Sequence, residues 1–259
     1  MSIADQAPEN SVIARLEALE SNREIHAHGG LSYEVLSALE NILPDSMDNT
    51  AETGCGRSTI LFSNISLHHD VFCIEDRSYK DRSSVDYFEQ SSMSKPKNVH
   101  WHFGPTQQTL PVHQHDVQYD CVLLDGPHGY PFPDLEYCFF YPHIKTGGFL
   151  IVDDIHIPSI SRMADILQED AMWQFIALAT KTAVFQRTDE APTPPLGDHW
   201  WTQGYNRRRI NPEMEFYLDD MNTATPFLER SRQQDAEWER KYNPGFLERV
   251  LRKLGLKRP

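Results

Sequence analysis

Short apolar segments alternate with amphipathic segments through the middle of the chain. The apolar segments predict buried strands, and the amphipathic ones, with apolar residues three or four positions apart, predict helices. Strands are expected in a short stretch ending at Glu52 and at residues 71–74, 99–103, 119–124 and 149–152. Helices are expected at residues 58–66, 81–90, 134–143 and 159–170, with an exit turn at residues 145–148. This alternation predicts an α/β protein in which helices cover both faces of a mostly parallel sheet.

The two ends of the chain have a different pattern. Two amphipathic helices are expected before the sheet, at residues 11–24 and 32–43, and segments 175–179 and 183–186 predict a closing hairpin. We therefore expect three parts. They are an N-terminal helical cap, a central ligand-binding domain, and a tail with an aromatic-rich loop and a basic C-terminal helix, at residues 1–45, 46–190 and 191–259.

Each part of the tail leaves two interpretations open. The tryptophan-rich loop at residues 198–209 suits a lid that stacks on a flat ligand or sugar face, or a packed surface loop. The basic amphipathic helix at residues 246–256 could touch a membrane surface or a partner. Docking on its own domain, or on a second subunit of a homo-oligomer, is the favoured interpretation.

Composition narrows the class of protein. A chain of 259 residues is long enough for one large α/β domain with appendages. Its formal net charge of −14 disfavours nucleic acid as a partner, because phosphate binding needs a basic face. No apolar run is long enough to span a bilayer, and the polar first ten residues do not resemble a signal peptide. The four cysteines lack paired spacing, so reduced thiols and a cytoplasmic location are expected.

Polar or turn-forming residues follow the predicted strands. Glu52, Asp125 and Gly104 each end one strand, and acidic pairs end two others, at residues 75–76 and 153–154. The carboxyl ends of parallel strands meet at one edge of a sheet, which is where open α/β sheets bind ligands. The alternative is a chance scatter of acidic residues in an acidic chain.

A glycine turn at residues 51–59 follows the first strand. Gly54 and Gly56 permit a sharp turn and the close approach of a ligand. Ser58 or Thr59 is expected to open the next helix, whose N-terminal N–H groups favour a polar or anionic ligand group. An ordinary tight turn is the alternative.

Taken in order, four segments resemble class I S-adenosylmethionine (SAM)-dependent methyltransferases. The resemblance is closest to small-molecule O-methyltransferase-like families, of the methyltransferase family 24 type. The segments that carry it are residues 52–59, 74–76, 124–130 and 147–154. The resemblance implies a Rossmann-like fold, with a seven-stranded, mostly parallel sheet that ends in an antiparallel hairpin.

The same resemblance implies a role in SAM binding for a set of residues. Gly54 and Gly56 would lie near the methionine part, with Glu52 near its amino group, and Glu75 would accept both ribose hydroxyls. Glu75 could instead be a solvated acid at the end of its strand. The full predicted cofactor set, which includes candidates for the adenine edge, is Glu52, Gly54, Gly56, Ser58, Glu75, Asp76, Thr106, Gln107 and Asp125.

The resemblance also implies a catalytic and metal-binding group. Asp125, Asp153 and Asp154 end adjacent strands, and carboxylates suit Mg²⁺, which would bind the acceptor hydroxyl. His128 is the predicted base, together with Asp125, although the catechol-type enzymes have a lysine where His128 stands. His156 is a second candidate base. In the alternative without a metal, Asp125 contacts SAM and the other two aspartates cap the next helix.

Other sites and functions are disfavoured. Three histidine pairs with one intervening residue lack a nearby cysteine or third histidine, so zinc is not expected; they are His26/His28, His100/His102 and His113/His115. The turn also lacks the third glycine of a nicotinamide dehydrogenase. We therefore expect SAM-dependent methyl transfer to a hydroxyl of a small molecule, such as a sugar or secondary metabolite. The alternatives are a metal-independent methyltransferase and a non-catalytic SAM-binding module.

Overall fold

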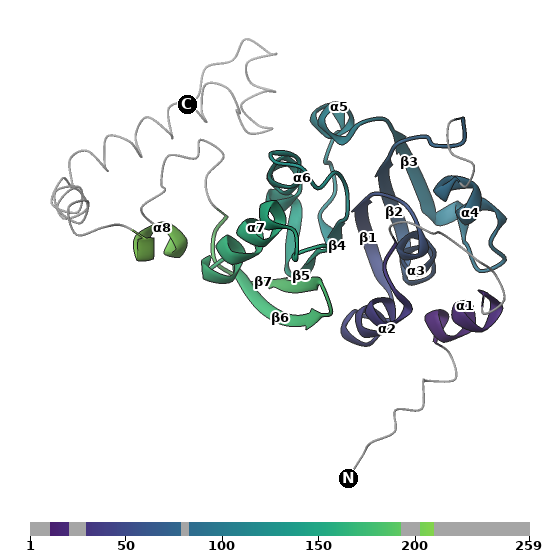
Figure 1. Cartoon of the computed structure of the whole chain (residues 1–259), viewed down its shortest axis with the longest axis horizontal. Coiled ribbons are helices and arrows are strands. Elements are labelled where there is room, and N and C mark those ends of the chain that lie inside the picture. Colours follow the sequence, from purple (N-terminus) through teal and green to yellow (C-terminus); the bar gives the residue numbers. More distant parts are fainter. Residues whose placement is uncertain (1–10, 21–29, 79–82, 193–202, 210–259) are drawn as a thin grey trace, which may run out of the picture. The chain divides into compact units, whose positions relative to one another are not determined.

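The computed structural model of the chain describes residues 11–20, 30–78, 83–192 and 203–209 (Figure 1). Its centre is a seven-stranded sheet with the strand order β3-β2-β1-β4-β5-β7-β6. The first five strands run parallel to one another, whereas β7 is antiparallel to β5 and β6 is antiparallel to β7. The strands are β1 (Met47–Thr53), β2 (Ser66–Cys73), β3 (Val99–Phe103), β4 (Tyr119–Leu124), β5 (Ile144–Val152), β6 (Trp173–Ala179) and β7 (Thr182–Arg187). The predicted fold class is thereby confirmed.

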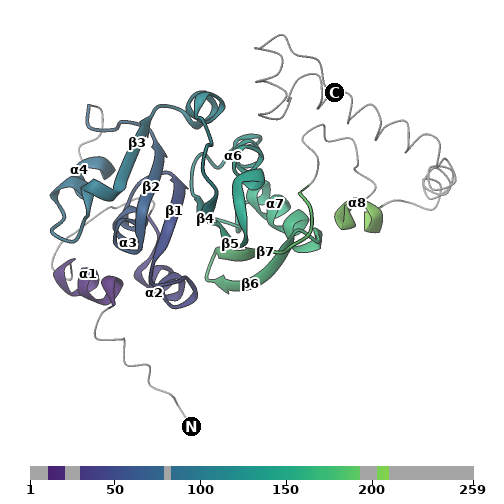
Figure 2. The ribbon, with the colours of Figure 1, turned by 180° about the vertical axis from the view of Figure 1, so that it is seen from behind.

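Helices cover both faces of this sheet, as the two opposite views in Figures 1 and 2 show. Buried apolar residues of α1 to α4 pack on one face, and those of α6 and α7 pack on the other. The α-helices are α1 (Val12–Glu20), α2 (Tyr33–Ile42), α3 (Arg57–Ile65), α4 (Ser84–Gln90), α5 (Thr106–Thr109), α6 (Phe132–Phe140), α7 (Pro158–Glu169) and α8 (Gly204–Arg209). Three short 3₁₀ turns complete the described elements: η1 (Pro96–Asn98), η2 (Leu110–Val112) and η3 (Tyr141–His143).

Two strands extend beyond the segments that the sequence predicts. β2 begins at Ser66 rather than at residue 71, because its polar first half pairs in parallel register with β1. The exit turn expected at residues 145–148 is wrong, since these residues belong to β5. The register between β4 and β5 shifts between Tyr119 and Cys121, so the glycines of that stretch lie in an irregular part of the strand.

The start of the second helix agrees with the sequence. Ser32 is the N-cap of α2, and its side chain accepts a hydrogen bond from the Val35 N–H. The first helix is described from Val12 to Glu20, and its predicted continuation to residue 24 lies outside the described residues. The predicted basic helix at residues 246–256 and most of the tryptophan-rich loop also lie outside them.

The chain divides into two compact units. The first comprises residues 1–199 and 203–205, and the second comprises residues 200–202 and 206–259. The helices of the predicted N-terminal cap therefore belong to the same unit as the sheet. Among the described residues, no helix is both long enough and apolar enough to cross a membrane.

Candidate active site

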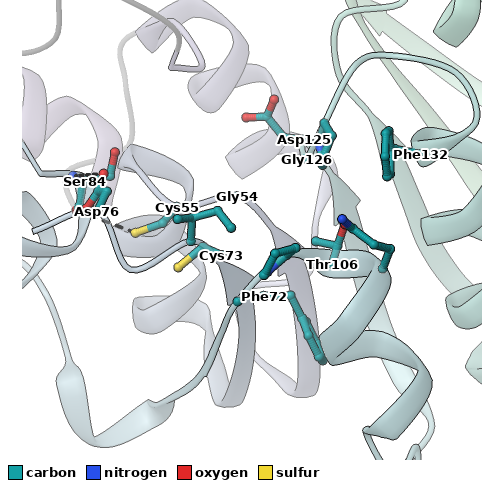
Figure 3. A pocket seen from close by; sticks show the side chains of 15 residues that line it. Gly54, Cys55, Phe72, Cys73, Asp76, Ser84, Thr106, Asp125, Gly126 and Phe132 are labelled. Atoms are coloured by element: carbon teal, nitrogen blue, oxygen red, sulfur yellow. Dashed lines mark hydrogen bonds between the residues drawn. The ribbon is translucent and has the colours of Figure 1, made fainter. Parts of the chain in front are cut away.

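A cavity of about 400 Å³ opens at the carboxyl edge of the parallel strands (Figure 3). Its walls come from the loops that follow β1, β2, β3 and β4, together with the start of α4 and the start of α6. Five of the predicted cofactor residues line it: Gly54, Asp76, Thr106, Gln107 and Asp125. Four others do not: Glu52, Gly56, Ser58 and Glu75.

Gly54 joins the loop after β1 to the loop after β4. Its φ is +93°, in the region that favours glycine, and its N–H donates a hydrogen bond to the Phe72 carbonyl oxygen at 2.9 Å. A Cβ at this position would lie 2.5 Å from the backbone oxygen of Asp125. Gly54 thus has a steric role within the protein itself, in addition to leaving the cavity open.

Gly56 has no comparable steric constraint. Its φ of 175° is extended, and an added Cβ would meet no atom within 4 Å. The expectation that Ser58 or Thr59 opens the helix is wrong, because α3 begins at Arg57 with Gly56 as its N-cap. Thr59 instead accepts a hydrogen bond from the Gly56 N–H at 2.9 Å. Ser58 is buried within the helix.

Glu52 lies in the interior of the protein rather than on the cavity wall. Its side chain is fully buried, and its Oε1 accepts a hydrogen bond from the Thr59 hydroxyl. The same oxygen lies 3.3 Å from His69 Nε2. His69 in turn contacts Thr50 Oγ1 through Nδ1 at 2.8 Å. These contacts connect the start of α3 to the buried parts of β1 and β2.

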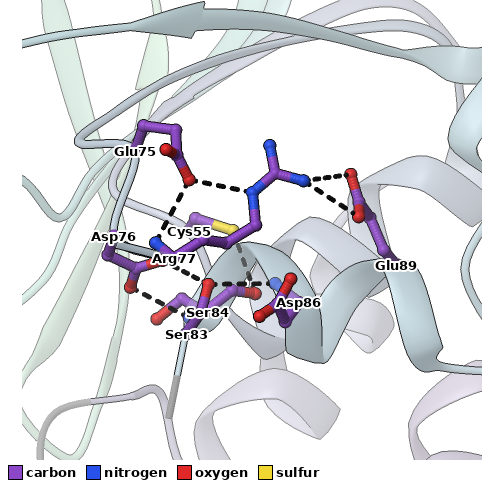
Figure 4. Close-up of polar contacts among 8 residues, drawn as sticks. All are labelled: Cys55, Glu75, Asp76, Arg77, Ser83, Ser84, Asp86 and Glu89. Atoms are coloured by element: carbon purple, nitrogen blue, oxygen red, sulfur yellow. Dashed lines mark hydrogen bonds and ion pairs between the residues drawn. The ribbon is translucent and has the colours of Figure 1, made fainter. Parts of the chain in front are cut away.

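The two acids after β2 have different surroundings (Figure 4). Glu75 lies at the surface and pairs with Arg77, whose Nε is 2.8 Å from Glu75 Oε1. Hydrogen bonds from Arg77 lower the pKa of Glu75. Asp76 is buried and accepts hydrogen bonds from the Ser83 hydroxyl and from the Ser84 N–H, the latter at 2.9 Å. Of the two, Asp76 is the acid that lines the cavity.

Thr106 and Gln107 line the cavity from the first turn of α5. The Thr106 side chain is buried, and its Oγ1 has no hydrogen-bond partner within the described protein. A buried hydroxyl without a partner is costly, and a polar ligand group would satisfy it. The Glu136 carboxyl group is close enough to Thr106 for their interaction to lower the Glu136 pKa, so a ligand would compete with Glu136 for this hydroxyl.

Asp125, His128 and Asp154 converge beside the cavity. His128 Nε2 lies 3.1 Å from Asp154 Oδ2 and 3.8 Å from Asp125 Oδ1. Asp154 has a φ of +56°, which turns the chain directly after β5. His156, the second candidate base, is more exposed, and its Nδ1 lies 3.7 Å from Asp154 Oδ1.

The environment of this cluster changes two pKa values. Burial, together with the charges of Asp153 and Asp154, raises the pKa of Asp125 to about 7, although the nearby His128 side chain opposes the rise. The pKa of His128 is raised by the neighbouring carboxylates of Asp125 and Asp154, against the effect of partial burial. The histidine therefore holds a proton more tightly than a solvated imidazole does.

Asp153 does not converge with the other two aspartates. Its Oδ1 accepts a hydrogen bond from the Thr182 hydroxyl, and its Oδ2 lies 3.7 Å from Lys181 Nζ. Lys181 also donates a hydrogen bond to Asp154 Oδ1. The potential ligand atoms that do converge come from Asp125, Asp154 and the His128 imidazole. A set with an imidazole, and with an ammonium group already paired to one carboxylate, is a poorer fit to Mg²⁺ than three carboxylates are.

Glu136 is a residue beside the site that the sequence did not indicate. It lies in α6, is buried, and accepts a hydrogen bond from the Thr53 hydroxyl at 2.7 Å. Thr53 Oγ1 also accepts a hydrogen bond from the Asp125 N–H at 3.1 Å. Burial raises the pKa of Glu136 to about 7, although the hydrogen bond from Thr53 opposes this. A Cβ on Gly126 would lie 2.1 Å from Glu136 Oε1, so the carboxyl group packs directly on the loop after β4.

Comparisons with known proteins agree with this architecture. Residues 51–155 match the model of a family described as a methyltransferase domain. The O-methyltransferase TomG from Streptomyces achromogenes, solved with SAM, superposes with a TM-score of 0.51 at 14% identity, covering 70% of this chain and 92% of that one. An O-methyltransferase from Bacillus cereus, solved with SAH, gives a TM-score of 0.50 at 14% identity and the same two coverages.

At these identities, the structural likeness establishes the fold. No curated protein matches the sequence. The matched domain includes the glycine turn, the acids after β2, and the Asp125, His128 and Asp154 cluster. Residues 51–155 are thus similar to a methyltransferase domain, and the fold of the chain is that of the solved O-methyltransferases.

Proposed function

We propose that the chain transfers the methyl group of SAM to a hydroxyl of a small molecule, with His128 as the base. The proposal rests on the position of Asp125, which belongs both to the cavity wall and to the cluster of Asp125, His128 and Asp154. Asp125 lines the cavity and at the same time lies 3.8 Å from His128 Nε2. A cofactor bound in the cavity would therefore lie next to a group that can accept a proton.

We assign the cofactor contacts to the predicted residues that line the cavity. Gly54 keeps a side chain out of it, and Asp76 presents a carboxylate suited to hydroxyl groups. Thr106 Oγ1 gains a hydrogen-bond partner when a polar ligand group enters. Glu52, Gly56, Ser58 and Glu75 do not line the cavity, and we give them a supporting role around it.

SAM supplies an electrophilic methyl group on its sulfonium centre. The protein positions the acceptor oxygen in line with that methyl group and removes the hydroxyl proton. His128 Nε2 donates its hydrogen to Asp154 Oδ2, 3.1 Å away, which leaves Nδ1 to accept the proton. Asp154 and Asp125 then stabilise the imidazolium ion that forms.

The metal-independent form of this reaction is the one that the contacts favour. Lys181 pairs with Asp154 and lies near Asp153, so an ammonium group already supplies positive charge beside the cluster. Asp153 is turned towards Thr182. Mg²⁺ assistance, with Asp125, Asp153 and Asp154 as ligands, stays a prediction that a chelation experiment decides.

The proposal is tested first by calorimetric titration with SAM and by turnover over a panel of hydroxyl-bearing acceptors. In the His128→Ala variant, kcat should fall about 100-fold to 10,000-fold while SAM affinity stays within error of wild type. His156→Ala is the matched control and should keep most of the turnover. Full activity of His128→Ala would refute the assignment of the base. Binding of SAM without turnover of any acceptor would favour a non-catalytic module.

The second experiment separates the two mechanisms. The chain is treated with EDTA, dialysed, and assayed with and without added Mg²⁺. Turnover that is unchanged by either treatment supports the metal-independent mechanism. Turnover that disappears with EDTA and returns with Mg²⁺ overturns it and supports the metal-binding aspartates.

A further inference from the structure

A second group of potential metal ligands lies away from the catalytic cluster. Asp70, His102 and His113 come from β2, from β3 and from the segment after η2. One ligand atom from each lies within 4.8 Å of the other two. Asp70 and His102 reach each other because β2 and β3 pair in parallel, with Phe72 opposite His102.

The contacts within this group are already those of a converging site. His102 Nε2 lies 2.8 Å from Asp70 Oδ1. Tyr119 donates a hydrogen bond to Asp70 Oδ2 at 3.1 Å, and its hydroxyl lies 3.4 Å from His113 Nε2. Ligands that bind zinc at about 2.0–2.1 Å are themselves roughly 3 Å apart, so small side-chain adjustments suffice.

His115 packs beside this group. Both of its ring nitrogens are buried, and neither has a hydrogen-bond partner within the described protein. Its ring packs edge-on against His113, with 4.7 Å between centroids, and stacks on His143 at 4.8 Å.

The group is also accessible. A cavity of about 520 Å³ is lined by His102 and His113, together with the last residues of β3, α5 and η2 and residues of the segment after η2. An ion can therefore reach the two imidazoles without opening the sheet.

We propose that Asp70, His102 and His113 bind a divalent transition-metal ion, with Zn²⁺ as the ion that the donor set suits. Two imidazoles and one carboxylate are a ligand set that zinc accepts, with a further position open to water. On binding, Zn²⁺ replaces the proton that His102 Nε2 shares with Asp70, and that proton leaves to solvent. Tyr119 holds the second oxygen of the Asp70 carboxylate, as outer ligands do in metal sites.

The three residues of this group are far apart in the sequence, which is why the sequence pattern did not predict a zinc site. His102 and His113 belong to different histidine pairs, which are separated by a strand end, a short helix and a 3₁₀ turn. Their third partner is an aspartate on another strand. His100, the neighbour of His102 in sequence, contacts His68 instead, with 3.4 Å between His68 Nδ1 and His100 Nε2.

The site has a structural connection to the cofactor cavity. The Phe72 ring stacks on His102, with 4.4 Å between centroids, and Phe72 also lines the cavity. A bound ion would tie together β2, β3 and the chain leading into β4 beneath that wall. This role is independent of the methyl transfer proposed above.

The test is Zn²⁺ binding to the metal-free full chain, measured by equilibrium dialysis with elemental analysis, and repeated with Co²⁺ by visible absorption. Saturable binding of about one ion per chain is expected. Tyr119→Phe should weaken it about 10-fold to 100-fold, and Asp70→Asn and His113→Ala should weaken it further. Far-UV circular dichroism of the metal-free variants establishes that they are folded.

His100→Ala and His128→Ala are the matched controls, and both should bind Zn²⁺ as wild type does. The first changes the exposed histidine pair and the second changes the catalytic cluster. The proposal is overturned if the chain shows no saturable binding, or if Asp70→Asn and His113→Ala bind Zn²⁺ normally. It is equally overturned if binding is lost in either control. None of these outcomes depends on the methyltransferase reaction.

Discussion

Replacing Glu136 by glutamine tests whether the protein retains a carboxyl group that is costly to ionise. The Glu136 side chain is buried, and burial raises its pKa from the ordinary value of 4.5 to about 7. Between these two values, the folded protein keeps a proton that the unfolded chain has already lost. The free energy of unfolding therefore falls as the pH rises through this range, and the full cost is present above pH 7.

The size of the effect follows from the two pKa values. They differ by about 2.5, and each pKa unit corresponds to about 1.36 kcal/mol, so ionisation costs the wild-type protein about 3 kcal/mol at high pH. Glutamine cannot ionise and still offers an oxygen to the Thr53 hydroxyl. Glu136→Gln should thus be more stable than wild type, by a margin that grows by about 2 kcal/mol between pH 5.5 and pH 8.

The assay is urea unfolding of both proteins across that pH range, which stays above the isoelectric point of about 5.2. Glu34→Gln, at an exposed position in the first turn of α2, is the control and should follow wild type at every pH. Parallel pH curves for wild type and Glu136→Gln would refute the reasoning. A variant that is less stable than wild type at pH 8 would refute it as well.

Three further outcomes are expected. Gly54→Ala places its Cβ 2.5 Å from a backbone oxygen at a φ of +93°, so this variant should lose about 1–3 kcal/mol of stability together with SAM affinity. Gly56→Ala is the control and should change stability by less than about 0.5 kcal/mol. Equal denaturation midpoints for the two variants would contradict this. Gly126→Ala, whose Cβ would lie 2.1 Å from Glu136 Oε1, should destabilise the protein less than Gly54→Ala does in urea unfolding, because a side-chain carboxyl group can move aside and a backbone oxygen cannot. Asp154→Asn removes a carboxylate that raises the pKa of His128, so the pH at which kcat reaches half its maximum should move lower; an unchanged pH profile would argue against His128 as the base.

Local sequence determined the order of the elements and the kind of fold. Apolar runs that end in an acid or a glycine form strands whose carboxyl ends lie at one edge of the sheet. Parallel pairing aligns these ends, and the helices between the strands do not change this. Gly54 and Asp125 were identifiable because a turn residue and a strand-end acid are local features. The sequence also indicated Ser32 as a helix cap, since capping involves neighbours only three residues apart.

Only the tertiary structure decided which side chains share the site. Glu52 and Asp125 are both acids at or near the end of a strand, yet the first is buried against Thr59 and His69 and the second lines the cavity. Lys181 and Glu136 reach the cluster from a hairpin turn and from a helix, and neither position has a local pattern that marks it.

The physical reason is the distance along the chain over which each interaction acts. Strand, turn and cap preferences depend on residues that are adjacent in sequence, so the pattern of one segment is enough to predict them. The pKa of Glu136 and the convergence of Asp70, His102 and His113 depend on contacts between residues that are far apart in the chain. These contacts exist only once the sheet and its helices have packed, and so they could be established only from the folded structure.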